Sequence, residues 1–294
     1  MQPITRIYRQ LLPLLLLLLS TTSLAQQPHT LTGDIRVHKN FYSKILNNSR
    51  DVLVYLPPGY NENRKRRYSV FYMHDGQNLF DGATSFIPGQ EWRADETAQQ
   101  LIIEKKIEPL IIVGIYNTGK ERANEYTPTE DQKYKMGGKA DLYGRMLVEE
   151  LKPFIDQNYR TLTDAAHTGL GGSSLGGIVS LYVGLKYPKT FSRLAVISPS
   201  VWFADYQIVK FVEAMPTKPK VRIWLDIGTK EGRDAQEALE SVTSTRKLKE
   251  ALIKKGWKPA RDFNYFEAEG AEHNEKAWAA RMPQILTYLY GFKS

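Results

Sequence analysis

The chain has 294 residues, of which 42% are hydrophobic, and a formal net charge of +8. It contains no cysteine, which excludes disulfides and a cysteine-linked lipid anchor and leaves the hydrophobic core to stabilise the fold. The length suits one α/β domain or two average domains, and the basic balance favours an anionic cell envelope or an acidic polysaccharide as surroundings.

The first 25 residues have the pattern of a secretory signal peptide. Arg6 and Arg9 precede a leucine-rich run over 11–19 and a small-residue stretch that ends at Ala25. The apolar run is about half of the roughly 20 residues that span a bilayer, and Pro13 interrupts it. We therefore predict cleavage after Ala25, a periplasmic or secreted mature protein without stable membrane insertion, and no nucleic-acid partner.

Short apolar runs alternate with amphipathic stretches along residues 26–294. This alternation predicts a single α/β domain with about eight strands in a mostly parallel sheet and helices on both faces. The first two strands have no helix between them and should be antiparallel. The expected strands are 35–41, 52–56, 68–73, 110–115, 167–171, 194–198, 221–227 and 263–267, and the expected helices are 95–106, 142–158, 177–186, 235–255 and 275–290.

The strongest motif lies between an expected strand and an expected helix. It reads Gly172-Ser173-Ser174-Leu175-Gly176, and this context is typical of a nucleophile elbow, in which a strained serine projects from a sharp turn. The residues two before and two after the nucleophile must be small. Glycine satisfies this on both sides of Ser174, whereas Leu175 rules out Ser173. The spacing fits neither a phosphate loop nor a dinucleotide-binding loop, so we predict Ser174 as the nucleophile.

A serine nucleophile needs a base, which is usually histidine because its pKa lies near neutrality. Of the five histidines, His273 follows the last expected strand and precedes the last expected helix, where a hydrolase with the order Ser, acid, His places its base. His167 is expected inside the sheet as a packed residue. We predict His273 as the general base.

Three carboxylates near the preceding strand are candidates for the acid that orients His273. Asp226 lies inside the expected strand 221–227, and Asp234 stands just before a helix and is typical of an N-cap. Glu231 lies on the loop after the carboxyl end of the strand, where open α/β sheets build their sites. We favour Glu231, with Asp226 or a Ser-His dyad without an acid as the alternatives.

The oxyanion of an acyl-transfer intermediate needs two backbone donors. The N–H of Leu175, directly after the nucleophile, is one candidate. The loop after the third strand, from His74 to Asn78, supplies the other, and Gly76 allows a close backbone approach there. We choose the N–H of Gln77. A metal site at His74 and Asp75 is an alternative that lacks companion ligands.

At these motifs the chain resembles the esterase family of α/β-hydrolases that includes enterochelin, feruloyl and acetylxylan esterases, the S-formylglutathione hydrolases and the mycolyl transferases. The resemblance implies an α/β-hydrolase fold with Ser174, Glu231 and His273 as catalytic residues and Gln77 and Leu175 as oxyanion donors. Some relatives have Asp where Glu231 stands. The matching segments are 72–80, Arg122 with 125–128, 172–177, 198–200 with Trp202, 228–231 and 272–273.

The resemblance also gives four aromatic residues a context. Trp92, Tyr116, Tyr126 and Trp202 lie on loops that should open toward the elbow, where they either line a substrate pocket or cap the core. The reading is an exported serine carboxylesterase for a small-molecule or carbohydrate ester, with no metal or organic cofactor. An acyltransferase to a sugar or lipid hydroxyl and a non-catalytic binding module are the alternatives. The sequence leaves the oligomeric state open.

Overall fold

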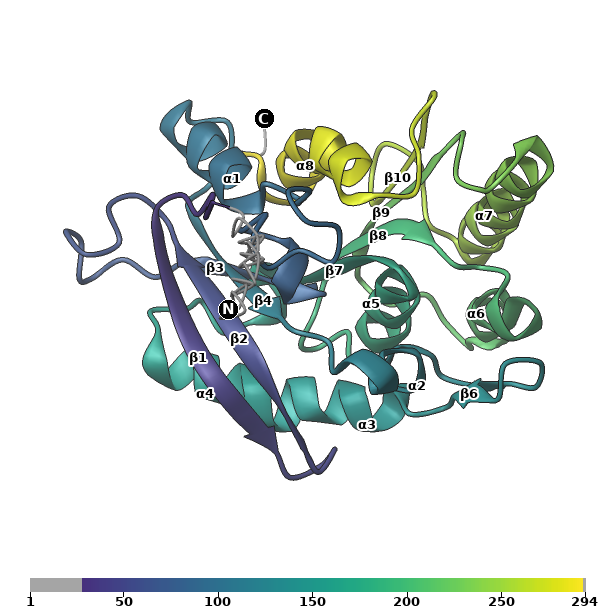
Figure 1. Ribbon diagram of the computed structural model, residues 1–294, viewed down its shortest axis with the longest axis horizontal. Helices are drawn as coiled ribbons and strands as arrows, with labels where there is room; N and C mark the ends of the chain where they lie inside the picture. Colours follow the sequence, from purple (N-terminus) through teal and green to yellow (C-terminus); the bar gives the residue numbers. More distant parts are fainter. Residues whose placement is uncertain (1–27, 293–294) are drawn as a thin grey trace, which may run out of the picture.

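An eight-stranded sheet runs through the protein in the order β1-β2-β4-β3-β7-β8-β9-β10 (Figure 1). The computed structural model describes residues 28–292, so the predicted signal peptide over 1–25 lies outside the described residues. β1 and β2 are antiparallel, β2 is antiparallel to β4, and the sheet is parallel from β4 to β10. The strands are β1 Asp34–Ser43, β2 Asn48–Leu56, β3 Ser69–His74, β4 Leu110–Ile115, β7 Thr168–Ser174, β8 Arg193–Pro199, β9 Arg222–Gly228 and β10 Phe263–Ala268.

Helices cover both faces of this sheet, as the alternating sequence pattern predicted (Figure 1). The structure adds a short helix α2, a two-stranded hairpin of β5 and β6, and helix α6, none of which we expected from the sequence. The helices are α1 Ala94–Ile103, α2 Arg122–Tyr126, α3 Ala140–Arg145, α4 Lys152–Asn158, α5 Leu175–Lys186, α6 Phe203–Ala214, α7 Ala235–Lys255 and α8 Glu275–Tyr290, and the hairpin strands are β5 Glu130–Asp131 and β6 Met136–Gly137.

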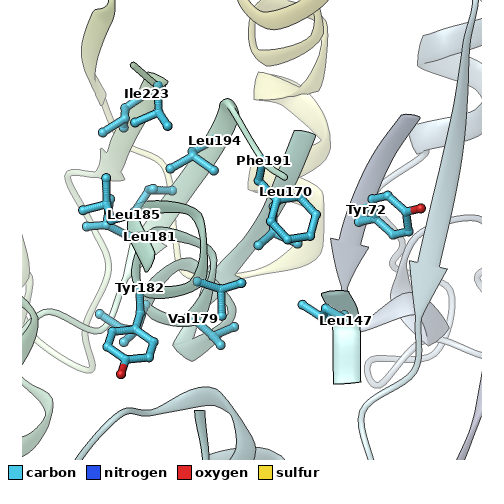
Figure 2. Close-up of a cluster of buried hydrophobic side chains, with 14 of the residues drawn as sticks. Tyr72, Leu147, Leu170, Val179, Leu181, Tyr182, Leu185, Phe191, Leu194 and Ile223 are labelled. Atoms are coloured by element: carbon cyan, nitrogen blue, oxygen red, sulfur yellow. The ribbon is translucent and has the colours of Figure 1, made fainter. Parts of the chain in front are cut away.

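Side chains of each strand alternate between two hydrophobic clusters, one on each face of the sheet. Along β3, Val70 and Tyr72 point to the face covered by α3 to α7, whereas Phe71 and Met73 point to the face covered by α1 and α8. Figure 2 shows part of the first cluster, in which Leu181 and Leu185 of α5 lie near the side chains of β8 and β9. The central strands are therefore buried on both faces and hold their carboxyl ends in fixed positions.

Two local expectations need comment. The expected helix over 142–158 forms as α3, a π-helical turn over Met146–Leu151, and α4. Pro153 stands in the first turn of α4, where its missing N–H is tolerated, so the irregular turn just before it takes the place of the kink we expected. The expectation for His167 was wrong: it lies before β7, is partly exposed, and pairs with Asp164. Within residues 28–292, no helix is long and apolar enough to cross a membrane.

Candidate active site

Ser174 ends β7 in a backbone conformation that side chains rarely adopt, with φ 60° and ψ −126°. The sharp turn brings neighbouring chains very close. A Cβ added at Gly172 would lie 3.1 Å from Cβ of His74, and one added at Gly177 would lie 3.1 Å from the carbonyl oxygen of Ile197. The glycines of the motif are therefore needed for space, and α5 begins directly after the serine. Ser173, in contrast, is a buried residue of β7.

His273 faces Glu231 across the loops that follow β10 and β9. Nδ1 of the imidazole lies 2.8 Å from Oε2 of the carboxylate. The Glu231 side chain is 2% exposed and that of His273 is 39% exposed, so the carboxylate lies behind a ring that reaches the surface. A hydrogen bond from Nδ1–H to a buried carboxylate fixes the tautomer that leaves Nε2 free to accept a proton.

The other carboxylate oxygen of Glu231 is held by three donors from different elements. Oε1 accepts a 2.7 Å hydrogen bond from the backbone N–H of Gly228 and one from the Ser198 hydroxyl, and Nη2 of Arg281 lies 3.6 Å away. Ser198 in turn accepts hydrogen bonds from the side chains of Trp278 and Arg281. These contacts fix the carboxylate and satisfy it after burial.

Asp226 has a different set of partners and does not contact His273. Its carboxylate accepts hydrogen bonds from the indole N–H of Trp224 at 2.7 Å and the backbone N–H of Ser198 at 3.1 Å, and it lies 3.3 Å from Arg281. Burial raises its pKa to about 6 despite the nearby Arg281 guanidinium. Asp226 therefore braces the sheet below the site.

Asp234 is the N-cap of α7. Its side chain accepts a 2.9 Å hydrogen bond from the backbone N–H of Glu237. This is the arrangement that an aspartate before a helix predicts, and it satisfies a donor that the first helical turn leaves unpaired.

The hydroxyl of Ser174 lies 3.1 Å from the hydroxyl of Ser200. In this conformation the two described residues Ser174 and His273 share no direct hydrogen bond. Both line the same pocket, and contacts between nucleophile and base often shorten only when substrate binds. The sequence did not identify Ser200 as a partner of the nucleophile, although its segment was among those that matched the esterases.

The pocket in front of Ser174 has a volume of about 830 Å³ and mixed walls. Tyr134 and Trp202 form an aromatic pair with ring centroids 6.2 Å apart, and Trp202 is 46% exposed. Cationic and anionic side chains face each other around them. The charged residues of the wall, besides His273 and Glu231, are Lys133, Lys230, Arg233, Glu237, Glu240 and Glu272.

The loop after β3 lies beside the elbow because β3 and β7 are parallel neighbours, with Met73 opposite Gly171. Asp75 has a left-handed backbone, φ 57° and ψ 47°. A Cβ on Gly76 would lie 2.5 Å from the carbonyl carbon of Gly114, so only glycine lets this loop lie against β4. The backbone of Gln77 and that of Leu175 are thus both at the carboxyl edge of the sheet, near Ser174.

Arg122 holds this loop by two hydrogen bonds to Asp75, from Nε at 2.8 Å and Nη2 at 2.7 Å. The side-chain amide of Asn117 adds a third, at 2.7 Å. Burial opposes ionisation of Asp75, but Arg122 and Asn117 outweigh it and hold the pKa of Asp75 below its usual value. Sequence reasoning listed Arg122 only as a matching residue, and the structure shows what it contacts.

These features match those of a known enzyme family. The profile of the family described as "Putative esterase" matches residues 43–289. The chain belongs to this esterase family. The structure has the α/β-hydrolase fold that the sequence predicted, and membership supports hydrolysis of an ester.

Three similar proteins illustrate the range of the family. The protein YjcH of Bacillus subtilis is 31% identical over 245 residues, which cover 82% of this chain and 91% of YjcH. An endo-1,4-beta-xylanase/feruloyl esterase of Xylanibacter ruminicola is 27% identical over 222 residues, 74% of this chain and 28% of that protein. The enterobactin esterase FES of Shigella flexneri has a similar fold, with a TM-score of 0.66, 19% identity, and coverage of 89% of this chain and 61% of FES.

Within this esterase, the four aromatic residues predicted to bind substrate have different positions. Trp202 is on the pocket wall. Trp92 and Tyr126 are core residues, 2% and 0% exposed: Trp92 packs against Trp278, and Tyr126 against His74. Tyr116 is half-buried beside the loop after β3 and does not line the pocket. The expectation was wrong for Trp92 and Tyr126 because loop residues next to the carboxyl edge can also turn inward.

His74 and Asp75 do not form the metal site considered as an alternative. Nδ1 of His74 lies 2.9 Å from the hydroxyl of Tyr143, and burial lowers the pKa of His74 to about 3, so the ring is neutral. Asp75 is taken up by Arg122 and Asn117. Both residues support the loop from below.

Proposed function

We propose that this protein is an exported serine carboxylesterase that cleaves its substrate through an acyl-enzyme. The observation that carries the proposal is the strained Ser174, which opens into the same pocket as a His273 ring backed by the buried Glu231. A nucleophile, a base and an acid in this order and arrangement are the components of serine-dependent acyl transfer.

The proposed reaction has two steps. His273 Nε2 takes the proton of the Ser174 hydroxyl as Oγ attacks the ester carbonyl, and the backbone N–H groups of Leu175 and Gln77 stabilise the negatively charged oxygen. His273 then returns the proton to the departing alcohol, which leaves an acyl group on Ser174. In the second step water gives a proton to His273, attacks the acyl carbonyl and releases the acid. The Ser174 side chain must turn from Ser200 toward His273 before the first step.

The proposed substrate is an acyl group on a carbohydrate, or a siderophore ester, rather than a long-chain lipid. The aromatic pair at Tyr134 and Trp202 offers flat apolar surface for an aryl group or a sugar ring, and the charged wall offers hydrogen-bond partners for hydroxyls or carboxylates. The names of two similar proteins, a feruloyl esterase and an enterobactin esterase, agree with this choice. The signal-peptide pattern supports a periplasmic or secreted location, where such esters occur.

Covalent labelling tests the nucleophile directly. A serine-directed phosphonate should attach once per chain, and peptide mapping by mass spectrometry should locate it on Ser174. Labelling elsewhere, or none together with no turnover of short activated esters, would overturn the proposal.

A substrate panel tests the rest. Acetylated and feruloylated xylan oligosaccharides and a catecholate trilactone should be cleaved in preference to emulsified triglyceride. A preference for triglyceride contradicts the substrate class, and acyl transfer to an added sugar that exceeds hydrolysis would favour the transferase alternative.

A further inference from the structure

Three carboxylates converge beside α1, away from the pocket. Glu91 precedes the helix, and Asp95 and Glu96 lie in its first turn. Each has an oxygen within 4.8 Å of an oxygen of the other two. Glu91 is 8% exposed and Asp95 is fully buried, while the side chain of Glu96 is 23% exposed and lies at the edge of the cluster. Carboxylates at such depth are uncommon unless a positive charge accompanies them.

Several oxygens in this cluster have no hydrogen-bond donor among residues 28–292. Oε2 of Glu91, Oδ1 of Asp95 and Oε2 of Glu96 are buried and unpaired, and so is the amide oxygen Oε1 of the adjacent Gln90. The hydroxyl of Tyr55, a fully buried residue of β2, is also unpaired. Tyr55 lies near enough that the charge of Asp95, after burial, contributes to its raised pKa. Buried polar atoms without a partner usually indicate a missing water or ion.

The protein supplies little positive charge here. The side chain of Arg93 is 64% exposed, and its Nε lies 3.8 Å from Glu96. The remaining donors are neutral: the hydroxyl of Thr30 bonds Glu91, and the backbone N–H of Thr32 bonds Asp95 at 2.7 Å. These bonds use the second oxygen of each carboxylate and leave the first free.

We propose that Glu91, Asp95 and Glu96, with the amide oxygen of Gln90, bind a calcium ion. The ligands are all oxygens, which is the set that calcium prefers, whereas zinc prefers nitrogen and sulfur. Two Ca–O bonds of about 2.3–2.6 Å span roughly 4.6 to 5.2 Å, so oxygens within 4.8 Å of one another can share one ion. The ion neutralises the buried charge and needs little movement of the helix.

The site would tie the N-terminal segment to the core of the enzyme. Thr30 and Thr32 hold the ligands from the segment before β1, and Trp92 lies in sequence between Glu91 and Asp95. Trp92 packs on Trp278 with ring centroids 5.3 Å apart, and Trp278 packs edge-on against His273 at 5.0 Å. Calcium would thus stabilise the fold first, and through these two indoles it would limit movement of His273.

A shared proton is the competing way to relieve the repulsion, since burial raises the pKa of Asp95. The two explanations predict different responses. Calcium binding gives a saturable heat in isothermal titration calorimetry of EDTA-treated wild-type protein, and a rise in the thermal midpoint of about 5 to 10 °C at 100 times the dissociation constant. A midpoint that rises only when the pH is lowered, with no heat on adding calcium, would overturn the proposal.

Terbium is a second probe, because Trp92 stands beside the ligands and can sensitise its luminescence. Wild-type protein should show luminescence that calcium displaces. Asp95→Asn and Glu91→Gln should lose both the luminescence and the calcium-dependent shift, whereas Glu250→Gln, a change to an exposed carboxylate of α7, should keep both. If the first two variants do not fold, the wild-type titrations decide. Equal calcium responses in Asp95→Asn and the control contradict the site. Binding and unfolding are measured without substrate, so the outcome is independent of the proposed esterase reaction.

Discussion

Glu231 and His273 come from loops 42 residues apart, and their side chains meet at 2.8 Å. The loops follow β9 and β10, which are parallel neighbours with Ala268 opposite Gly228. Both loops therefore leave the sheet at the same edge. Since Oε1 of Glu231 is already bonded to Gly228 and Ser198, only Oε2 is free to orient the imidazole.

Glu231→Gln should lower kcat by roughly 10² to 10⁴ while the protein stays folded, because the imidazole loses its tautomer and the stabilisation of its charged form. Steady-state kinetics and circular dichroism provide the measurement. Asp234→Asn is the matched control, since asparagine is an equally good N-cap and should leave kcat and the thermal midpoint unchanged. Activity retained in Glu231→Gln would indicate a Ser-His dyad.

Asp226→Asn should keep its activity and change how stability depends on pH. The folded-state pKa of about 6 lies above the model value of 3.8, so the folded state binds the proton more tightly. This contribution to stability is present below about pH 3.8 and is lost as the pH rises to about 6, by about 3 kcal/mol at most. The free energy of unfolding of wild type relative to Asp226→Asn should therefore fall over this range in denaturant titrations. A loss of activity without unfolding would instead make Asp226 the catalytic acid.

Ser174→Ala should reduce kcat for short activated esters on the order of 10³-fold or more, because only binding and oxyanion stabilisation remain. Ser200→Ala removes the neighbouring hydroxyl that holds Ser174 away from His273, so its kcat should change far less, with Ser174 still labelled by the phosphonate. Equal losses in the two variants would mean that Ser200 takes part in the reaction.

Arg122→Gln should lower kcat by about 10- to 100-fold with little change in KM, because the loop that carries Gln77 is no longer held at Asp75 and an oxyanion donor moves. Arg122→Lys should recover part of the loss, since one charged hydrogen bond can form. The exposed pair of Arg145 and Glu149 supplies the control, Arg145→Gln, which should leave both constants unchanged. A change confined to KM would contradict the positioning role.

Two tryptophans predicted to bind substrate should now separate. Trp202→Ala, at the exposed pocket wall, should raise KM for aryl or sugar esters and leave the thermal midpoint nearly unchanged. Trp92→Ala removes a buried ring and should reduce the free energy of unfolding by about 3 to 5 kcal/mol. Thermal unfolding and KM measured on both variants test the assignment, which fails if Trp202→Ala unfolds readily with KM unaffected.

The sequence predicted the elements that have strong local signals. The strand over 110–115 and the helices over 235–255 and 275–290 have the expected bounds, since their apolar patterns and caps lie within the segment itself. Helix α6 was missed. Its residues Ala204, Asp205 and Tyr206 have positive φ, so the segment begins irregularly and its periodicity is short.

Contacts between distant segments were beyond the sequence. The loop positions of Ser174, Glu231 and His273 followed from the order of strands, but their partners Ser198, Ser200 and Arg281 did not. The direction of an individual loop side chain depends on what packs beneath it. Spacing alone could not tell which of Trp92 and Trp202 faces the pocket.

The strained backbone at Ser174 also sets a limit on how stable this chain can become. A residue with a side chain in such a conformation costs on the order of 1–3 kcal/mol, whereas glycine adopts it freely. Ser174→Gly should therefore melt at a higher temperature than wild type while being inactive. Selection for heat resistance alone would discard the serine, so its presence at this turn reflects a requirement for reactivity that opposes folding stability.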